Sequence, residues 1–328
     1  MIWIDTKSED VYYNFGCELY FASEKRLPDD VFLMWRTSPT LMIGRFQNAL
    51  GEIDAAYARK HGVEVVRRLS GGGTIYTDMG GWQFTFITDK NPGIEIEFAR
   101  FTEPVLGLLV SLGVKAELTG RNDITVGGKK ISGNAQYRLG PVTVHHGSLL
   151  FDTDLDALGT ATRPKAYKIT SKAVSSVRDR VTNIKDVLPP EHANLTPDEF
   201  RRLAVEALAD AEYGITEEDD RRIRALADSR FRSEEELWGK TPRFGIEKDV
   251  HTAGGTFRIG MTVKNGVIED AGVEGDFFAS PDAAELLESA LKGTAYAPES
   301  VRRALESLGG KLNLFRAGVE EIARGMFE

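Results

Sequence analysis

Three consecutive glycines at positions 71–73 interrupt a segment that otherwise favours β structure. A β-branched run at 63–66 precedes them and residues 75–76 follow, which is typical of a strand, a glycine loop and a second strand. Glycine has no Cβ, so this loop can adopt positive φ and approach a ligand closely. Arg67 and Arg68, immediately upstream, could offer guanidinium groups to a phosphate or carboxylate. A plain turn with two solvated arginines is the competing interpretation.

The composition argues against several classes of protein. The 328-residue chain has no run of about 18 apolar residues that could span a membrane, and its first residues lack the basic and apolar regions of a signal peptide. Its single cysteine, Cys17, cannot form an internal disulfide, so we expect a cytoplasmic protein. The net charge of −9 argues against nonspecific nucleic-acid binding. His145 and His146 are adjacent and would point to opposite faces of a strand, so they cannot grip one metal ion together.

Apolar periodicity predicts the elements that precede the central motifs. Residues 10–25 have the pattern of a helix with a buried stripe. The apolar runs 31–35 and 41–44 lie on either side of Ser38-Pro39, which predicts two antiparallel strands around a tight turn. Segment 82–88 alternates apolar and polar residues, as a half-buried strand does.

Turn residues predict where hairpins and helices lie in the rest of the chain. Hairpins are predicted around the glycine pair at 127–128 and around Gly140-Pro141, and a further hairpin around Asn265-Gly266. Helices are predicted between 153 and 240. We therefore expect an α+β fold with a large mixed, mostly antiparallel sheet flanked by helices in residues 1–245. Residues 246–328 should form a small α+β accessory domain.

Lys130 and Asp123 are the first candidates for chemistry. A lysine followed by Ser-Gly-Asn-Ala suits an activated acyl group, because its ammonium can neutralise charge that develops on a phosphate and on the adjoining carbonyl. Asp123 could bind Mg²⁺, which accepts one or two carboxylates together with substrate phosphates. A solvated hairpin lysine and an Asn-Asp turn are the simpler interpretations of these two residues.

Five segments, taken in order, resemble the lipoate–protein ligases. They include RRLSGGGTIY at 67–76, GRNDITVGGKKISGNAQYR at 120–138 and HHGSLLFD at 145–152. IGRFQNAL at 43–50 and KITSKAVSSVRDRVTNI at 168–184 extend the likeness, and 239–248 and 263–278 resemble the family's accessory domain. The resemblance implies a fold related to biotin ligases and class II aminoacyl-tRNA synthetases. It also implies that ATP and lipoate form lipoyl-AMP, from which the lipoyl group passes to a lysine of an acceptor protein.

The resemblance assigns roles to particular residues. Lys130 matches the family's essential lysine and is the expected catalytic residue. Lipoate would lie near His146 and Gly147, and Asp123 would bind Mg²⁺. The residues expected to contact ATP or the lipoyl-adenylate are Arg68, Gly71, Gly72, Gly73, Thr74, Ile75, Tyr76, Asn122, Asp123, Lys130, Ser132, Gly133 and Ala135.

Two features depart from the family pattern. Thr77 stands where a histidine is usual, and Gly81-Trp82 replaces an asparagine and a smaller residue. Trp82 could alter the mouth of the acyl pocket or the surface on which the acceptor docks. The expected acceptors are lipoyl domains of dehydrogenase complexes or the glycine-cleavage carrier. An ATP-independent octanoyl or lipoyl transferase of the same fold, and a non-catalytic binding protein, are the alternatives.

Overall fold

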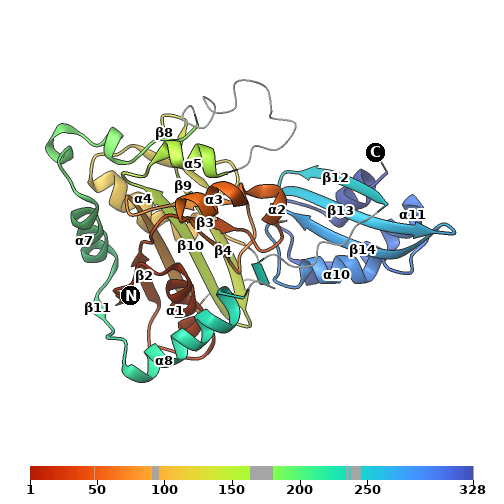
Figure 1. The fold of residues 1–328 in the computed structure, drawn as a ribbon, viewed down its shortest axis with the longest axis horizontal. Coiled ribbons are helices and arrows are strands. Elements are labelled where there is room, and N and C mark those ends of the chain that lie inside the picture. The colour runs from red at the N-terminus through yellow and green to blue at the C-terminus, as the bar shows by residue number, and fades with distance from the viewer. Residues whose placement is uncertain (48, 91–95, 163–179, 234–235, 238–244, 328) are drawn as a thin grey trace.

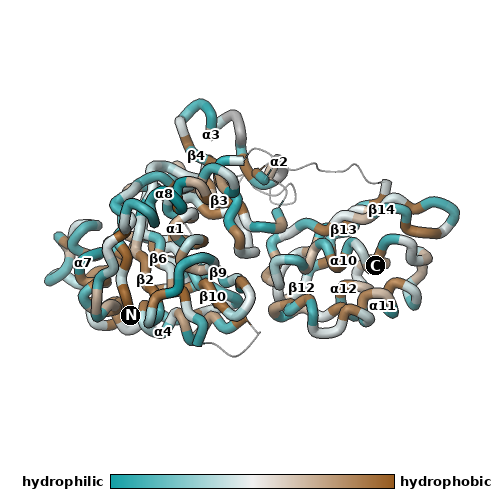
Figure 2. Tube along the Cα trace, turned by 90° about the horizontal axis from the view of Figure 1, so that it is seen from below, coloured by the Kyte–Doolittle hydropathy of each residue, from teal (hydrophilic) through white to brown (hydrophobic). Residues whose placement is uncertain are grey.

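The computed structural model describes residues 1–47, 49–90, 96–162, 180–233, 236–237 and 245–327. Figure 1 shows a larger N-terminal part, built on a twisted sheet, and a smaller module formed by the end of the chain. Figure 2 shows this module beside the larger part, with α2 (Ala49–Glu52) near the junction.

Among the described residues the large sheet has eight strands in the order β11-β1-β2-β6-β10-β9-β8-β7. The first two pairs, β11 with β1 and β1 with β2, are parallel, and the remaining pairs are antiparallel. The mixed, mostly antiparallel sheet expected from the hairpin signals is therefore confirmed. The strands are β1 (Ile2–Ile4), β2 (Val31–Trp35), β6 (Gly81–Thr88), β7 (Ala116–Thr119), β8 (Asp123–Val126), β9 (Lys129–Leu139), β10 (Val142–Leu150) and β11 (Ala211–Glu212).

Helices cover both faces of this sheet. One face packs on α1 (Val11–Ser23) and α8 (Glu217–Leu226), the other on α4 (Phe98–Ser111) and α7 (Pro197–Leu208). Strand β6 is therefore buried along its whole length, and the expectation that it is half-buried was wrong. Its alternation separates an apolar face towards α4 from polar side chains that find hydrogen-bond partners near α1, such as Thr85 with Glu18 at 2.9 Å.

The two apolar runs near Ser38-Pro39 do not pair with each other. β2 joins the large sheet, whereas β3 (Thr40–Ile43) lies between β4 (Glu64–Arg67) and β5 (Ile75–Thr77) in a separate small sheet. The predicted hairpin was wrong because both runs are fully buried, and such runs do not reveal their partners. The small sheet packs on α3 (Ala55–His61) and α5 (Leu155–Ala161).

Local turn and capping signals are confirmed where the structure describes them. Gly127 and Gly128 have φ of 57° and 78°, and Asn265 and Gly266 have 50° and 76°, as two-residue hairpins of the primed type require. Thr196 caps α7 in a complete capping box. The sequence Ser-Glu-Glu-Glu at 233–236 predicts a second capping box, which includes residues outside the described ranges. The segment from 180 to 231 also contains two short 3-10 helices, η2 (Lys185–Val187) and η3 (Pro190–His192), and a short π-helix, η4 (Ala227–Phe231).

The C-terminal module has its own hydrophobic core. Its antiparallel sheet packs against helices that surround residues such as Phe257 and Leu287, both about 1% exposed or less. This separate core supports our proposal that the chain divides into domains at residues 1–245 and 246–328. The module consists of β12 (Ile246–Thr252), β13 (Gly255–Lys264), β14 (Val267–Gly275), α10 (Ala283–Leu291), α11 (Pro298–Glu306), η5 (Gly309–Leu312) and α12 (Val319–Gly325).

The module contacts the glycine loop through backbone and aromatic rings. The N–H of Gly72 donates to the carbonyl of Phe277 at 3.1 Å, and the N–H of Gly275 donates to the carbonyl of Phe46. The ring of Phe46 stacks on that of Phe277 with 4.4 Å between centroids. A Cβ on Gly71 would lie 2.1 Å from the Phe277 oxygen, so this contact needs glycine.

Gly71→Ala should weaken the docking of the module by placing a methyl group against an immobile backbone oxygen. Overpacking of this kind costs about 1–3 kcal/mol, and thermal unfolding should show a lower or divided transition. Gly73→Ala is the matched control, because a Cβ there meets no atom within 4 Å. Equal stability of the two variants would contradict the docking contact described here.

Candidate active site

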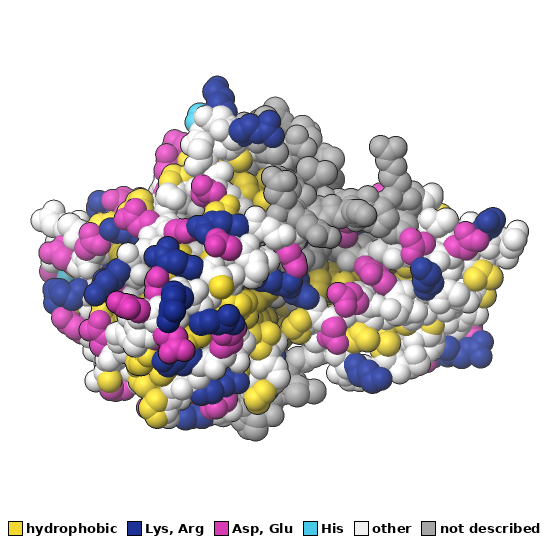
Figure 3. All heavy atoms as spheres, turned by 60° about the horizontal axis from the view of Figure 1, so that its bottom comes forward, with side chains coloured by type: hydrophobic (Ala, Val, Ile, Leu, Met, Phe, Trp, Pro, Cys, Tyr) yellow, Lys and Arg dark blue, Asp and Glu magenta, His cyan; other side chains and the backbone are white. Residues whose placement is uncertain are grey.

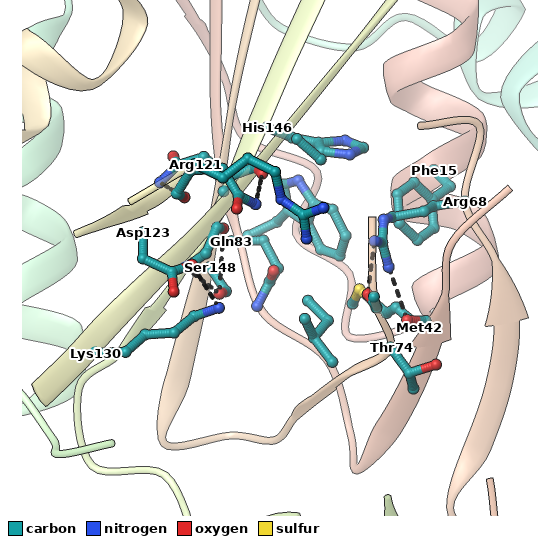
Figure 4. Close-up of a pocket in the computed structure, with 18 residues that line it drawn as sticks. Phe15, Met42, Arg68, Thr74, Gln83, Arg121, Asp123, Lys130, His146 and Ser148 are labelled. Atoms are coloured by element: carbon teal, nitrogen blue, oxygen red, sulfur yellow. Dashed lines mark hydrogen bonds and ion pairs between the residues drawn. The ribbon is translucent and has the colours of Figure 1, made fainter. Parts of the chain in front are cut away.

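A cavity of about 180 Å³ lies between the glycine loop, α1 and the strands β8, β9 and β10. Figure 4 shows Lys130 and Asp123 on one side of it, with Arg68, Phe15 and Met42 on the opposite side. Figure 3 shows hydrophobic side chains in the hollow where the two parts of the molecule meet, with basic side chains nearby. The cavity is lined by Phe15, Trp35, Met42, Arg68, Gly73, Thr74, Ile75, Gln83, Arg121, Asn122, Asp123, Lys130, Gly133, Asn134, Ala135, His146, Gly147 and Ser148.

Lys130 and Asp123 form an ion pair at the polar end of the cavity. The Lys130 Nζ lies 2.8 Å from Asp123 Oδ1, and each side chain is about one-third exposed. The pair spans the β8–β9 hairpin, whose tight turn brings the two residues together. A Cβ on Gly133 would lie 2.8 Å from the Lys130 Nζ, so the missing side chain leaves room for the ammonium. Such an exposed pair adds little stability, and both groups remain accessible to a ligand.

Arg68 holds the backbone of the glycine loop through hydrogen bonds. Its guanidinium is buried and donates to the carbonyls of Met42, Gly71 and Gly73 at 2.7–2.9 Å. Burial lowers the pKa of Arg68 to about 10, with the neighbouring Arg67 adding to the effect. The group is still charged at neutral pH. Arg68 lines the cavity, but its guanidinium donates to Ser70 and to loop carbonyls, so the expected contact of Arg68 with a phosphate stays a prediction.

A buried polar chain continues from Arg68 to α1. Ser70 Oγ accepts from Arg68 Nε at 3.1 Å and lies 2.7 Å from His146 Nε2. The other ring nitrogen of His146 lies 3.0 Å from Glu18, a carboxylate that also accepts from the Tyr137 hydroxyl. These contacts are satisfied by an imidazole that accepts at Nε2 and donates from Nδ1. Burial, together with the Glu18 charge, raises the pKa of Tyr137 well above its ordinary value.

Four residues expected at the ligand do not line the cavity. Gly71 and Gly72 lie against Phe277 and Phe278 of the C-terminal module. Tyr76 is on the opposite side of β5 from Ile75 and belongs to the core under the small sheet. Ser132 is fully buried and accepts from the amide of Asn134 at 3.3 Å. Successive side chains of a strand point to opposite faces, so the motifs on β5 and β9 do not reveal that Tyr76 and Ser132 lie away from the cavity.

Several lining residues were not singled out from the sequence. Arg121 and Asn134 fall inside motifs that were recognised, so their polar side chains were a usable signal. The apolar residues had no such signal, because each looks like an ordinary core residue until the fold brings it to the cavity. These apolar residues are Phe15, Trp35 and Met42. Two further polar residues line the cavity, namely Gln83 on β6 and Ser148 within the recognised segment 145–152.

The unusual residues Thr77 and Trp82 lie outside the cavity wall. Trp82 faces the α4 side of the sheet, is 3% exposed and donates from Nε1 to the carbonyl of Pro197. The suggestion that it alters the mouth of the pocket is therefore wrong. Thr77 contacts the cavity-lining Gln83, whose amide donates to the Thr77 hydroxyl at 2.9 Å.

The described residues contain no cluster of three or more His, Cys, Asp or Glu side chains that could bind a metal by themselves. Asp123 is a single carboxylate facing the cavity, which suits a Mg²⁺ ion whose other ligands are water and phosphate oxygens. No helix in the described ranges has the length and hydropathy needed to cross a membrane.

Comparison with known proteins identifies the family. Residues 10–209 match the lipoyl protein ligase A/B catalytic domain, and residues 241–324 match the bacterial lipoate protein ligase C-terminus. Lipoate–protein ligase 1 of Staphylococcus aureus is 37% identical over 300 residues, covering 90% of each chain. The lipoate–protein ligase LplJ of Bacillus subtilis is 35% identical over 319 residues, covering 95% of each chain. The chain belongs to the lipoate–protein ligase family and is a ligase.

Solved structures agree with this assignment. The lipoate complex of LipL1 from P. falciparum has a TM-score of 0.78 at 21% identity and covers 94% of each chain, which shows a shared fold. A lipoate–protein ligase A structure with bound ATP has a TM-score of 0.60 at 25% identity and covers 73% of this chain and 97% of its own. A two-part ligase of Thermoplasma acidophilum, studied with its E2 lipoyl domain, has a TM-score of 0.64 at 25% identity. It covers 75% of this chain and 98% of its own.

His145 should make the stability of the protein sensitive to acid. Burial, with a smaller effect of His146, holds the pKa of His145 well below its ordinary value, so the native imidazole stays neutral. Below about pH 6.5 the unfolded state gains a proton that the native state lacks, and the free energy of unfolding falls by up to about 1.4 kcal/mol per pH unit. Denaturant unfolding between pH 5 and 8 should show a shallower acid slope for His145→Phe. Equal slopes for both proteins would refute this role of His145.

Proposed function

We propose that this chain activates free lipoate with ATP in the cavity and transfers the lipoyl group to a lysine of an acceptor carrier protein. The supporting observation is the division of the cavity into two ends. Phe15, Trp35 and Met42 provide an apolar wall that suits an acyl tail, and the ion pair of Lys130 and Asp123 lies on the side opposite Phe15 and Met42. An amphipathic acid joined to a phosphate matches this arrangement.

The reaction requires two substitutions and no enzyme nucleophile. First, a lipoate carboxylate oxygen attacks the α-phosphorus of ATP, and the bond to pyrophosphate breaks. Second, the acceptor amine attacks the carbonyl carbon of lipoyl-AMP, the bond to AMP breaks and the amine loses a proton. Positioning and charge neutralisation are what the protein must supply. Lys130 is the proposed catalytic residue, because its ammonium can reach both the α-phosphate and the carbonyl oxygen.

The backbone of the glycine loop is the proposed binding site of the nucleotide. Gly73, Thr74 and Ile75 line the cavity opposite the Lys130 hairpin, so the adenylate would lie between the two. Asp123 is the residue that would hold Mg²⁺, which would neutralise part of the triphosphate charge. Gly71 and Gly72 support the loop at its contact with the C-terminal module.

A cysteine-dependent acyl transferase is a poorer fit to this chain. Cys17 is its single cysteine, and its thiol is fully buried in α1. Burial raises the pKa of Cys17, so the thiolate needed for nucleophilic attack is disfavoured. Cys17 is also absent from the cavity lining.

The acceptor is proposed to be a small carrier domain with an exposed lysine. The Thermoplasma ligase was studied with an E2 lipoyl domain, which favours a lipoyl domain of a dehydrogenase complex for this chain too. The glycine-cleavage carrier is the second candidate.

Lys130→Ala should reduce lipoyl-AMP formation by about 100-fold or more, the range seen when a preorganised charge is removed from a transition state. The fold should survive, because the side chain is about one-third exposed and lies on a hairpin. Lys129→Ala is the matched control, since Lys129 is the neighbouring exposed lysine. The measurement is radiolabelled lipoyl-AMP after a single turnover. Normal yield from Lys130→Ala would disprove its catalytic role.

Pyrophosphate release should depend on both lipoate and Mg²⁺. A panel of lipoate, octanoate and biotin tests the acid, and subsequent transfer to purified carrier domains tests the acceptor. Lipoate should give the highest kcat/KM and biotin none above background. Release that continues without any added acid would overturn the proposed function.

A further inference from the structure

A histidine lies in an aromatic cage behind the cavity. His145 on β10 is fully buried, and its ring stacks on Phe101 with 5.0 Å between centroids and 14° between planes. The rings of Phe84, Phe86 and Phe98 surround it at 6.0–6.5 Å. Four aromatic neighbours would accept another apolar ring at this position, so packing alone does not explain an imidazole here.

Of the two ring nitrogens of His145, one has a hydrogen-bond partner among the described residues and the other has none. Nδ1 is buried without a hydrogen bond, whereas Nε2 lies 3.3 Å from Asn134 Oδ1. A buried nitrogen without a partner is unfavourable. The amide oxygen of Asn134 can only accept, so the shared hydrogen must be on Nε2 of His145.

Asn134 lines the cavity, and its side chain holds the turn at residues 120–122, between β7 and β8. Its Nδ2 donates to the carbonyl of Asn122 at 3.1 Å, and Asn122 Nδ2 donates back to the carbonyl of Asn134. The residue after Asn122 is Asp123, which pairs with Lys130. The amide of Asn134 thus connects the caged histidine to the turn that presents the ion pair.

A second feature of β10 fits the same amide. A Cβ on Gly147 would lie 2.5 Å from Asn134 Oδ1 and 2.4 Å from the ring of Phe84. Gly147 therefore leaves the space that the Asn134 side chain occupies. Two residues of β10 therefore set the position of the Asn134 amide. His145 donates a hydrogen bond to it, and Gly147 leaves space for it because it has no side chain.

We propose that His145 is a positioning residue for adenylation. It donates from Nε2 to Asn134 Oδ1, fixes the orientation of that amide and so holds the turn that presents Asp123 to Lys130. This inference rests on the proposed function, because its effect is read in the formation of lipoyl-AMP.

His145→Phe separates positioning from packing. The new ring fills the cage and removes the unpartnered Nδ1, while the buried Asn134 Oδ1 loses its donor. These effects oppose each other, so the midpoint of thermal unfolding at pH 7.5 should change little. The kcat of lipoate-dependent pyrophosphate release should nevertheless fall about tenfold. His145→Gln should recover most of the rate, because its side-chain N–H can replace the Nε2 donor. His145→Met, a flexible apolar filling, is the second variant if phenylalanine does not fit.

A double-mutant cycle tests whether His145 acts through Asn134. In an Asn134→Ala background, His145→Phe should cause no further loss of kcat, since the amide it orients is gone. Phe101→Leu is the matched control, expected to lower the unfolding midpoint while leaving kcat within about twofold. Wild-type kcat in both His145→Phe and His145→Met, or independent effects in the cycle, would overturn the proposal.

The two proposals fail in different ways. If the wild-type protein shows no lipoate-dependent pyrophosphate release, the proposed function fails. If the wild-type protein is active and the apolar His145 variants keep its rate, only the positioning role fails.

Discussion

One buried guanidinium group, that of Arg68, and one partly buried group, that of Arg67, hold the backbone around the glycine loop, and the form of the active site depends on them. Arg68 fixes the loop from within, and burial lowers the pKa of Arg67 as well. A lysine could not replace either group, because a single ammonium cannot reach carbonyls on separate segments. Loss of either arginine would leave several backbone carbonyls without their present donor. The carbonyls bound by Arg67 are those of Gly44, Arg45, Gln47, Glu236 and Leu237.

Local signals in the sequence were enough to predict the elements that depend on local chemistry. The glycine pair of the β8–β9 hairpin and the Asn265-Gly266 turn adopt the positive φ values that their residue types indicate. The helix at 10–25 begins where Asp10 accepts hydrogen bonds from Tyr12 and Tyr13. Strand partners were less predictable, because β2 and β3 are short, buried runs whose neighbours come from distant parts of the chain.

The sequence predicted which motifs meet at the candidate site, but it did not predict which side chains within those motifs face the cavity. The motifs at the glycine loop, the Lys130 hairpin and β10 do meet at one cavity. Within them, Ile75 faces the cavity and Tyr76 faces a core, which depends on strand orientation. The contribution of Phe15 depends on how α1 crosses the sheet, and no local pattern contains that information.

Because Gly71 contacts Phe277, the shape of the loop depends on both the N-terminal part of the chain and the C-terminal module. A change at this contact need not alter any atom that lines the cavity. It would instead alter the fraction of molecules in which the module is docked, and each 1.4 kcal/mol lost from docking lowers the ratio of docked to undocked molecules about tenfold. Substitutions near Phe277 would therefore change the overall rate of the ligase by changing the fraction of docked molecules. The rate of the reaction within each docked molecule would stay the same.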